Sequence, residues 1–177
     1  MNNNLESNNT QSLTCRGEQF IIKGLLDTIE TSMGYEEAKK VAYTTGFKIG
    51  TKLGTKLGSG GIVDSFERFI NYVTPYYQVT NLGIDQHPDR YSASVRFDGC
   101  IIRKILGEGY ASHPIGCRMT QGYIEGALST MTGRKVEELV FESSIDSNTC
   151  VGQINFYNVP VSNQSASQSG APRFLIK

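Results

Sequence analysis

The chain has 177 residues, the size of one domain, and its 17 Lys and Arg against 17 Asp and Glu leave a formal net charge of zero. A nucleic-acid-binding domain is usually strongly basic, so this balance argues against that class of protein. No apolar run approaches the roughly 20 residues of a membrane span, and the chain begins without the basic and apolar parts of a signal peptide. We therefore expect a cytoplasmic protein with no membrane span and no nucleic-acid partner.

Composition divides the chain into three parts. Residues 1–16 are rich in Asn, Ser and Thr and are expected to form a flexible leader. Residues 17–158 hold the apolar residues of one folded domain. Residues 159–177 read as a polar linker that ends in an apolar tip, 174–176, which is too short to fold alone.

The first half of the domain is expected to be helical. Apolar residues recur at helical spacing over 18–33, 35–57 and 62–76, with Gly34 between the first two segments and a glycine-rich break at 58–61 before the third. These spacings predict three helices, of which the second is the longest.

In the second half of the domain, the spacing of apolar residues changes from mainly helical to mainly alternating. Alternating or β-rich runs predict strands over 77–84, 91–97, 135–143 and 150–157, and a helix is expected over 115–131. Helices followed by hairpin strands favour an α+β fold, with helices packed on an antiparallel sheet. In the strand over 135–143, Glu138 and Glu142 share one face, and we expect that face to meet solvent.

A stripe of glycines runs along the second helix, because Gly46, Gly50 and Gly54 recur every four residues. Each interior glycine costs a helix about 1 kcal/mol relative to alanine, so a close contact must offset the loss. Gly122 and Gly126 give the later helix a similar patch. Three uses remain open for these smooth faces: helix packing within the fold, packing between two copies of the chain, or contact with a flat ligand.

No catalytic arrangement stands out in the sequence. The chain has only two histidines, His87 and His113, and it lacks both the G-x-G-x-x-G and the phosphate-binding loop patterns. His113 and Cys117 could share a metal only if the helix reached back past Pro114, which proline disfavours. The four cysteines are widely spaced without a C-x-x-C pair, so they are expected as reduced thiols. We therefore do not expect an enzyme.

The segment 115–156 carries a family resemblance: IGCRMTQGYIEGALSTMTGRKVEELVFESSIDSNTCVGQINF. A helix with a cysteine near its start and a G-x-x-x-G-like stretch leads into a strand with an acidic residue, and a hairpin follows. This arrangement resembles the 4-vinyl reductase domain family and the related core subunits of the TRAPP vesicle-tethering complex, over about residues 18–157. The resemblance implies helices on an antiparallel sheet, assembly as a homodimer, and a cavity for a small hydrophobic molecule.

The same resemblance implies a candidate metal site. Some members of the family bind zinc through cysteines and an acidic residue around the final hairpin, and the matching residues here are Cys117, Glu142 and Cys150. Positions 143–145, where a further cysteine is usual, read Ser, Ser and Ile, so the ligand set is incomplete.

Members of the family that this segment resembles occur in the bacteriochlorophyll pathway and near photosystem assembly. The resemblance therefore implies a non-catalytic sensor, carrier or assembly factor that binds a planar hydrophobic ligand such as a tetrapyrrole, in chlorophyll biosynthesis or photosystem assembly. Aromatic side chains and one histidine are the candidate pocket residues, although each also suits an ordinary core: Phe66, Phe69, Tyr72, Tyr76, Tyr77, Tyr110, His113 and Tyr123. Two alternatives stay open. One is an accessory protein in vinyl-tetrapyrrole reduction, which would need a partner to supply the hydride. The other is a structural adaptor of the TRAPP-subunit type with a protein partner.

Overall fold

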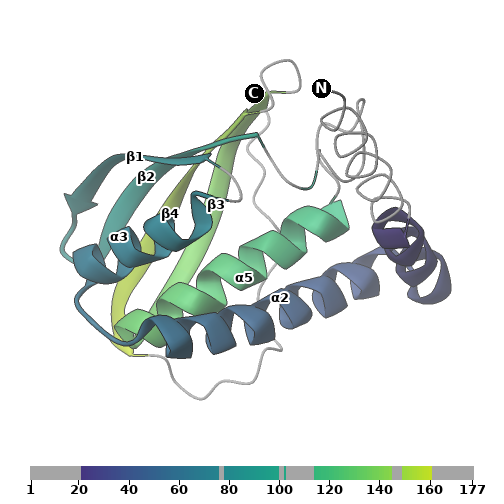
Figure 1. Cartoon of the computed structure of the whole chain (residues 1–177), viewed down its shortest axis with the longest axis horizontal. Coiled ribbons are helices and arrows are strands. Elements are labelled where there is room, and N and C mark those ends of the chain that lie inside the picture. The colour runs from purple at the N-terminus through teal and green to yellow at the C-terminus, as the bar shows by residue number, and fades with distance from the viewer. Residues whose placement is uncertain (1–20, 76–77, 100–101, 103–113, 145–148, 161–177) are drawn as a thin grey trace, which may run out of the picture.

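The computed structural model describes residues 21–75, 78–99, 102, 114–144 and 149–160, without the side chains of 114, 141–144 and 160. The leader over 1–16 and the segment 161–177 lie outside this range. In chain order the elements are a helix over 21–33, α2 (Tyr35–Leu57), α3 (Ile62–Val73), β1 (Gln78–Gln86), β2 (Arg90–Asp98), α5 (Pro114–Thr132), β3 (Arg134–Ser144) and β4 (Thr149–Pro160), as Figure 1 shows.

The observed elements follow the predicted ones closely. The helix expected over 35–57 is α2 without change, and Gly34, at φ 79°, separates it from the helix before it. α3 ends at Val73, three residues before its predicted end. The first two strands lie closer together in sequence than the predicted strands over 77–84 and 91–97. β1 runs to Gln86, β2 begins at Arg90, and the backbone N–H of His87 donates to the carbonyl of Arg90 at 2.8 Å. The two strands therefore form a tight hairpin.

The four strands form one antiparallel sheet in the order β1-β2-β4-β3. β4 is an inner strand that pairs with both β2 and β3, and β3 lies at an edge. In register, Ala93 of β2 and Glu138 of β3 both lie opposite Ile154 of β4, so these three residues share one face of the sheet. That face is the one that packs on helices.

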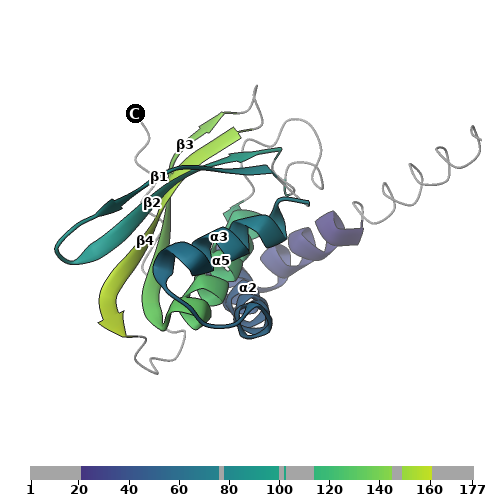
Figure 2. The same cartoon turned by 60° about the vertical axis from the view of Figure 1, so that its left-hand side comes forward.

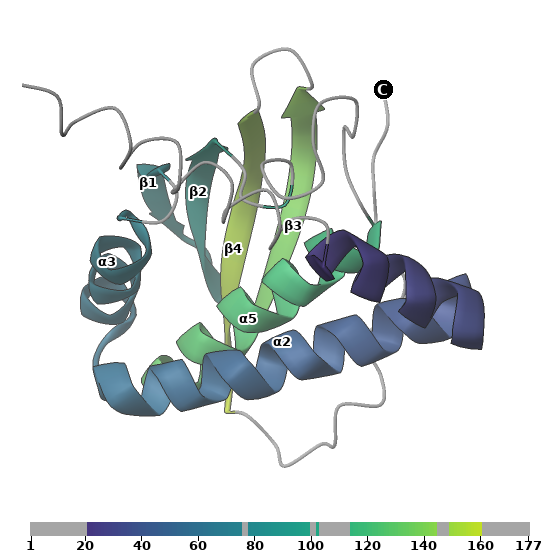
Figure 3. The same cartoon turned by 45° about the vertical axis from the view of Figure 1, so that its right-hand side comes forward.

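Helices α3 and α5 cover this face of the sheet, and α2 packs on α5 on the side away from the sheet (Figures 2 and 3). The core between the helices and the sheet consists of buried apolar side chains from every layer: Leu53, Phe66, Phe69, Val73, Ala93, Val95, Ile124, Ala127, Leu128, Met131, Val136, Ile154 and Phe156. The predicted α+β fold, with helices packed on an antiparallel sheet, is thus confirmed. None of the helices that the structure describes is long and apolar enough to cross a membrane.

The glycine stripe of α2 lies directly against α5. A Cβ atom added at Gly46, Gly50 or Gly54 would come within 1.9, 2.1 or 2.5 Å of the carbonyl oxygen of Met119, Tyr123 or Ala127, which real structures do not allow. The partners advance by four residues in both helices in the same direction, so α2 and α5 run parallel. Only glycine permits two helix backbones to approach this closely.

The glycines of α5 complete the contact. A Cβ at Gly122 would lie 2.2 Å from the carbonyl oxygen of Tyr43, and one at Gly126 would lie 2.3 Å from that of Phe47. Glycines of the two helices therefore alternate along one seam inside a single chain, and α5 covers the α2 stripe. The five glycines are consequently not exposed as a face between two copies. Lys48, Lys52 and Lys56 lie on the exposed side of α2.

Candidate functional site

A group of polar side chains is buried where α2, α5 and β3 meet. Its centre is Glu125, the only charged residue in the twelve-residue stretch 121–132 and 4% exposed. Glu125 lies between Gly122 and Gly126 in sequence, and the close approach of the helices at these glycines brings the α2 side chain of Tyr43 within reach. The packing contact predicted from the glycines thus also positions the polar group.

The Glu125 carboxylate accepts hydrogen bonds from all three elements. The hydroxyl of Tyr43 donates to Oε2 at 2.5 Å. Nε2 of Gln121 and the backbone N–H of Glu138 donate to Oε1 at 2.8 and 2.9 Å. Gln121 also donates to the carbonyl of Glu138 at 3.2 Å. One carboxylate therefore connects α2, α5 and the edge strand β3, as a buried acidic group requires.

Arg118 brings a positive charge to the same place. Its guanidinium lies over the ring of Tyr43, 5.0 Å from the ring centre, and donates to Oε1 of Gln121 at 2.5 Å. Arg118 is only 7% exposed. Because Arg118, Gln121 and Glu125 are spaced three and four residues apart, they lie on one side of α5.

Glu138 is the second buried acid, and the expectation that its face meets solvent was wrong. It lies on the inner face of β3, opposite Ile154, and is 7% exposed. α5 packs over this face and removes it from water. Within the residues that the structure describes, the Glu138 carboxyl makes no hydrogen bond, although its own backbone is bonded to Glu125 and Gln121. An acid in this setting is costly to ionise.

The pKa values in the cluster follow from burial. Desolvation raises the pKa of Glu138 to about 8, and the nearby charge of Glu125 contributes to the rise. Desolvation also raises the pKa of Glu125, against hydrogen bonds from Tyr43, Glu138 and Gln121 and the charge of Arg118, all of which lower it. Burial, followed by the charge of Glu125, raises the pKa of the Tyr43 hydroxyl. At neutral pH the Glu138 carboxyl is therefore mostly protonated and can donate a hydrogen bond.

An apolar cluster adjoins the polar one, toward the start of α2 and of α5. Its buried members come from the helix over 21–33, from α2, from α5 and from residue 102: Leu26, Ala38, Ala42, Ile102 and Ile115. Ala42 precedes Tyr43, and Met119, which packs against this cluster, follows Arg118. Apolar side chains beside a few polar groups are the usual composition of a small-molecule site.

The aromatic residues expected to line a pocket are distributed differently. Phe66 and Phe69 are 0% and 1% exposed and belong to the core between helices and sheet. There Phe66 packs edge-on against Phe156, with 6.1 Å between the ring centres. Tyr72 and Tyr123 are partly buried and pack on the same core, Tyr123 at 6.2 Å from Phe69. The remaining four lie outside the described residues: Tyr76, Tyr77, Tyr110 and His113.

The candidate zinc ligands are only partly described. Cys117 lies in the first turn of α5 and Cys150 in β4, and both are half-buried thiols. Glu142 lies opposite Val151 in the β3–β4 register, but its side chain is outside the described part. Among the described residues, no three His, Cys, Asp or Glu side chains are grouped so that they could hold a metal ion. The zinc set stays a prediction.

Sequence reasoning missed the buried cluster altogether. Glu125 was the available signal, since a lone charge among glycines and apolar residues on a helix that packs on both sides must be buried or paired. Tyr43 and Glu138 carried no comparable signal, because their inward orientation depends on which elements cover them.

Comparisons with known proteins support the fold. No family model matches the sequence, and no curated protein matches it. Among solved structures, the phenol-responsive sensory domain of the transcription activator PoxR, crystallised with phenol, aligns with a TM-score of 0.58 at 17% identity, over 78% of this chain and 74% of that one. A trafficking protein particle complex subunit 3 from Naegleria fowleri, covalently bound to palmitic acid, aligns with a TM-score of 0.54 at 11% identity, over 85% of this chain and 99% of that one. At these identities the likeness shows a shared fold.

Proposed function

We propose that this chain is a ligand-binding domain for a small aromatic molecule that carries a hydroxyl group, with the buried acid Glu138 as the anchor of that hydroxyl. The observation that carries the proposal is a carboxyl group, on a residue only 7% exposed, that makes no hydrogen bond in the described part of the chain. Buried polar groups are nearly always bonded, so an available one beside an apolar cluster suits a ligand.

The likeness to a phenol-responsive sensory domain supports the same class of ligand. A phenolic hydroxyl both donates and accepts hydrogen bonds, so it can accept one from the protonated Glu138 carboxyl or donate one to a carboxylate. The bonds from Tyr43 and Gln121 hold Glu125 in place before a ligand arrives, and Glu125 in turn holds the backbone of Glu138. Such preorganisation lowers the cost of binding. We propose a sensor or carrier role for the chain.

A tetrapyrrole, the ligand implied by the family resemblance, is the larger alternative. The polar groups at the site form one compact cluster, which suits a ligand with a single ring and hydroxyl. Titration with phenol and with a soluble porphyrin in parallel separates the two: binding of the porphyrin alone would support the tetrapyrrole and contradict the single-ring ligand.

The test compares phenol with toluene, which has the same ring and no hydroxyl, by calorimetric titration of the full chain. We expect phenol to bind at least about tenfold more tightly than toluene, the value of one hydrogen bond to a buried group. In Glu138→Leu this preference should disappear. The matched control is Glu137→Leu on the opposite face of the same strand, which should keep it. Equal binding of phenol and toluene to the unmodified chain would contradict the proposal.

A second candidate is a structural adaptor, as in the trafficking subunit that shares the fold. The observation in its favour is that Phe66 and Phe69 fill the core rather than line a cavity. Native mass spectrometry distinguishes the candidates: a chain that never carries a small-molecule adduct, with phenol or porphyrin added, favours the adaptor. The same spectrum tests the expected homodimer, and cell fractionation tests the expected cytoplasmic location.

A further inference from the structure

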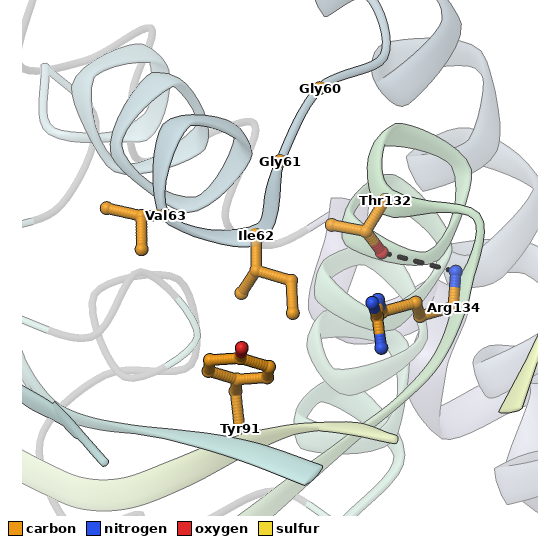
Figure 4. A pocket seen from close by; sticks show the side chains of 7 residues that line it. All are labelled: Gly60, Gly61, Ile62, Val63, Tyr91, Thr132 and Arg134. Atoms are coloured by element: carbon orange, nitrogen blue, oxygen red, sulfur yellow. Dashed lines mark hydrogen bonds between the residues drawn. The ribbon is translucent and has the colours of Figure 1, made fainter. Parts of the chain in front are cut away.

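A cavity of about 310 Å³ opens near the ends of α2 and α5, and neither Glu125 nor Glu138 lines it. It lies between the start of α3, Tyr91 at the beginning of β2 and the junction of α5 with β3 (Figure 4). Its volume is at the lower limit of small-molecule sites, which range from roughly 300 to 1,000 Å³. One ring with one substituent is therefore the size of ligand that fits.

The α2–α3 connection forms one wall of the cavity and is held firmly. Gly58, at φ 83°, ends α2, and the backbone N–H of Gly60 donates to the carbonyl of Met131 at 3.0 Å. The guanidinium of Arg68 donates to the carbonyls of Leu57 and Ser59 at 2.7 and 3.1 Å. The wall is thus fixed to the ends of α2 and α5 before any ligand binds.

The junction of α5 and β3 forms the opposite wall. Gly133, at φ 66°, reverses the chain there, a conformation that favours glycine. The backbone N–H of Arg134 then donates to the Thr132 hydroxyl at 3.3 Å, so both residues flank the cavity (Figure 4). The reversal places the Arg134 side chain across from Ile62.

The cavity combines an apolar slot with one positive charge. Figure 4 shows the ring of Tyr91 facing Ile62, with Val63 beyond it and the guanidinium of Arg134 to one side. Among the described residues that line it, Arg134 alone is charged. Arg134 donates to the neutral Oδ1 of Asn158 and forms no ion pair with a described acid. A guanidinium has five N–H donors, so most of them remain for an anion.

We propose that this cavity binds a small aromatic carboxylate, with the ring between Tyr91 and Ile62 and the carboxylate on Arg134. Planar guanidinium and carboxylate groups match each other through paired hydrogen bonds, and a flat ring suits the slot. The anion also lies near the start of α3, whose positive dipole end has no side-chain cap. This site is separate from the acids Glu125 and Glu138 and does not depend on the function proposed for them.

The test uses benzoate as the probe and the full chain labelled with ¹⁵N. Addition of benzoate should shift the backbone amides of Gly60, Gly61, Tyr91 and Arg134 in a saturable manner. Benzamide has the same shape without the charge and should bind at least about tenfold more weakly, as expected when a charge-assisted hydrogen bond is lost. Phenol in a third titration should leave these four amides unshifted.

Two variants and one control make the result decisive. Arg134→Gln should weaken benzoate binding about ten- to a hundredfold. Val63→Trp should block the slot while keeping the charge, and since Val63 is 50% exposed the fold should tolerate it. Arg96→Gln, which removes a guanidinium from an exposed position of β2, should leave binding unchanged.

Three outcomes would overturn the proposal: benzoate shifts none of the four amides, benzamide binds equally well, or Arg134→Gln and Arg96→Gln weaken binding alike. If Arg134→Gln does not fold, Val63→Trp decides, because unchanged binding in that variant would place benzoate elsewhere. If benzoate binds and phenol does not, the function proposed for the acid cluster is contradicted and the proposal for this cavity is supported. If phenol binds and benzoate does not, only the proposal for this cavity is contradicted.

Discussion

The hydroxyl of Tyr43 donates a 2.5 Å hydrogen bond to Oε2 of Glu125, between residues 82 positions apart in sequence. The bond joins the two parallel helices at the point where Gly122 faces the carbonyl of Tyr43. Close backbone contact and a buried acid therefore belong to one arrangement: the glycines bring the helices together, and the tyrosine satisfies the carboxylate that the contact buries.

Replacing this tyrosine should be costly. In Tyr43→Phe the buried Glu125 carboxylate loses one donor, and we expect the free energy of unfolding to fall by about 1–3 kcal/mol. Tyr157→Phe is the matched control, since Tyr157 donates to the half-buried Glu137 at 2.6 Å and water can replace that bond. Its cost should stay below about 1 kcal/mol. Urea unfolding of both variants measures the difference. Equal losses of stability would contradict the conclusion that the buried Glu125 carboxylate depends on the hydrogen bond from Tyr43.

The stability of the domain should fall as pH rises from about 4.5 to about 8. Glu138 has an ordinary pKa of 4.5 when unfolded and about 8 when folded, so in this window the folded chain holds more protons than the unfolded chain. Each such proton contributes a slope of at most about 1.4 kcal/mol per pH unit. The raised pKa of Glu125 acts in the same direction.

The variant Glu138→Gln isolates this effect, because its neutral amide resembles the protonated acid at every pH. Urea unfolding across the window should show a flatter pH dependence in Glu138→Gln and an unchanged one in Glu137→Gln. A variant that keeps the full slope would show that Glu138 ionises freely in the folded chain.

The helix seam should reject even one methyl group. In Gly50→Ala the new Cβ would lie 2.1 Å from the carbonyl oxygen of Tyr123, a backbone atom that cannot move alone, so α2 and α5 must separate. We expect a loss of about 3 kcal/mol or more. Gly24→Ala, in the helix over 21–33, meets nothing within 4 Å and should stabilise the chain by up to about 1 kcal/mol. Thermal unfolding of both variants tests the contact between α2 and α5, because the same Gly→Ala substitution should lower the stability at position 50 and raise it at position 24.

The α2–α3 connection should loosen when Arg68 is shortened. Arg68→Lys keeps the charge but cannot reach the carbonyls of Leu57 and Ser59 together. We expect a loss of about 1 kcal/mol and faster hydrogen exchange at the Gly60 amide, which donates to Met131. Arg90→Lys, at an exposed pair with the adjacent Asp89, should change neither quantity. Unchanged exchange in Arg68→Lys would mean that Met131 alone holds the connection.

The helices, the strands and the fold class could all be predicted from local patterns of residues. Helical spacing predicted α2 to the residue, alternation predicted the strands to within a few residues, and glycines at every fourth position marked a face without side chains. These features are local, since each depends on the period with which one segment repeats.

Which face of each element is buried, and against what, depends on how the elements pack together. In β3, both alternating sets contain an acid, Glu137 in one and Glu138 in the other, so the period could not tell which acid is buried. The choice followed from α5 covering the face that carries Val136 and Glu138. Likewise, the glycine stripe could have met a ligand, another copy or another helix, and it is the parallel packing of α5 on α2 that brought Tyr43 to Glu125. Contacts between segments far apart in sequence leave no local period, which is why the buried acids emerged only from the fold.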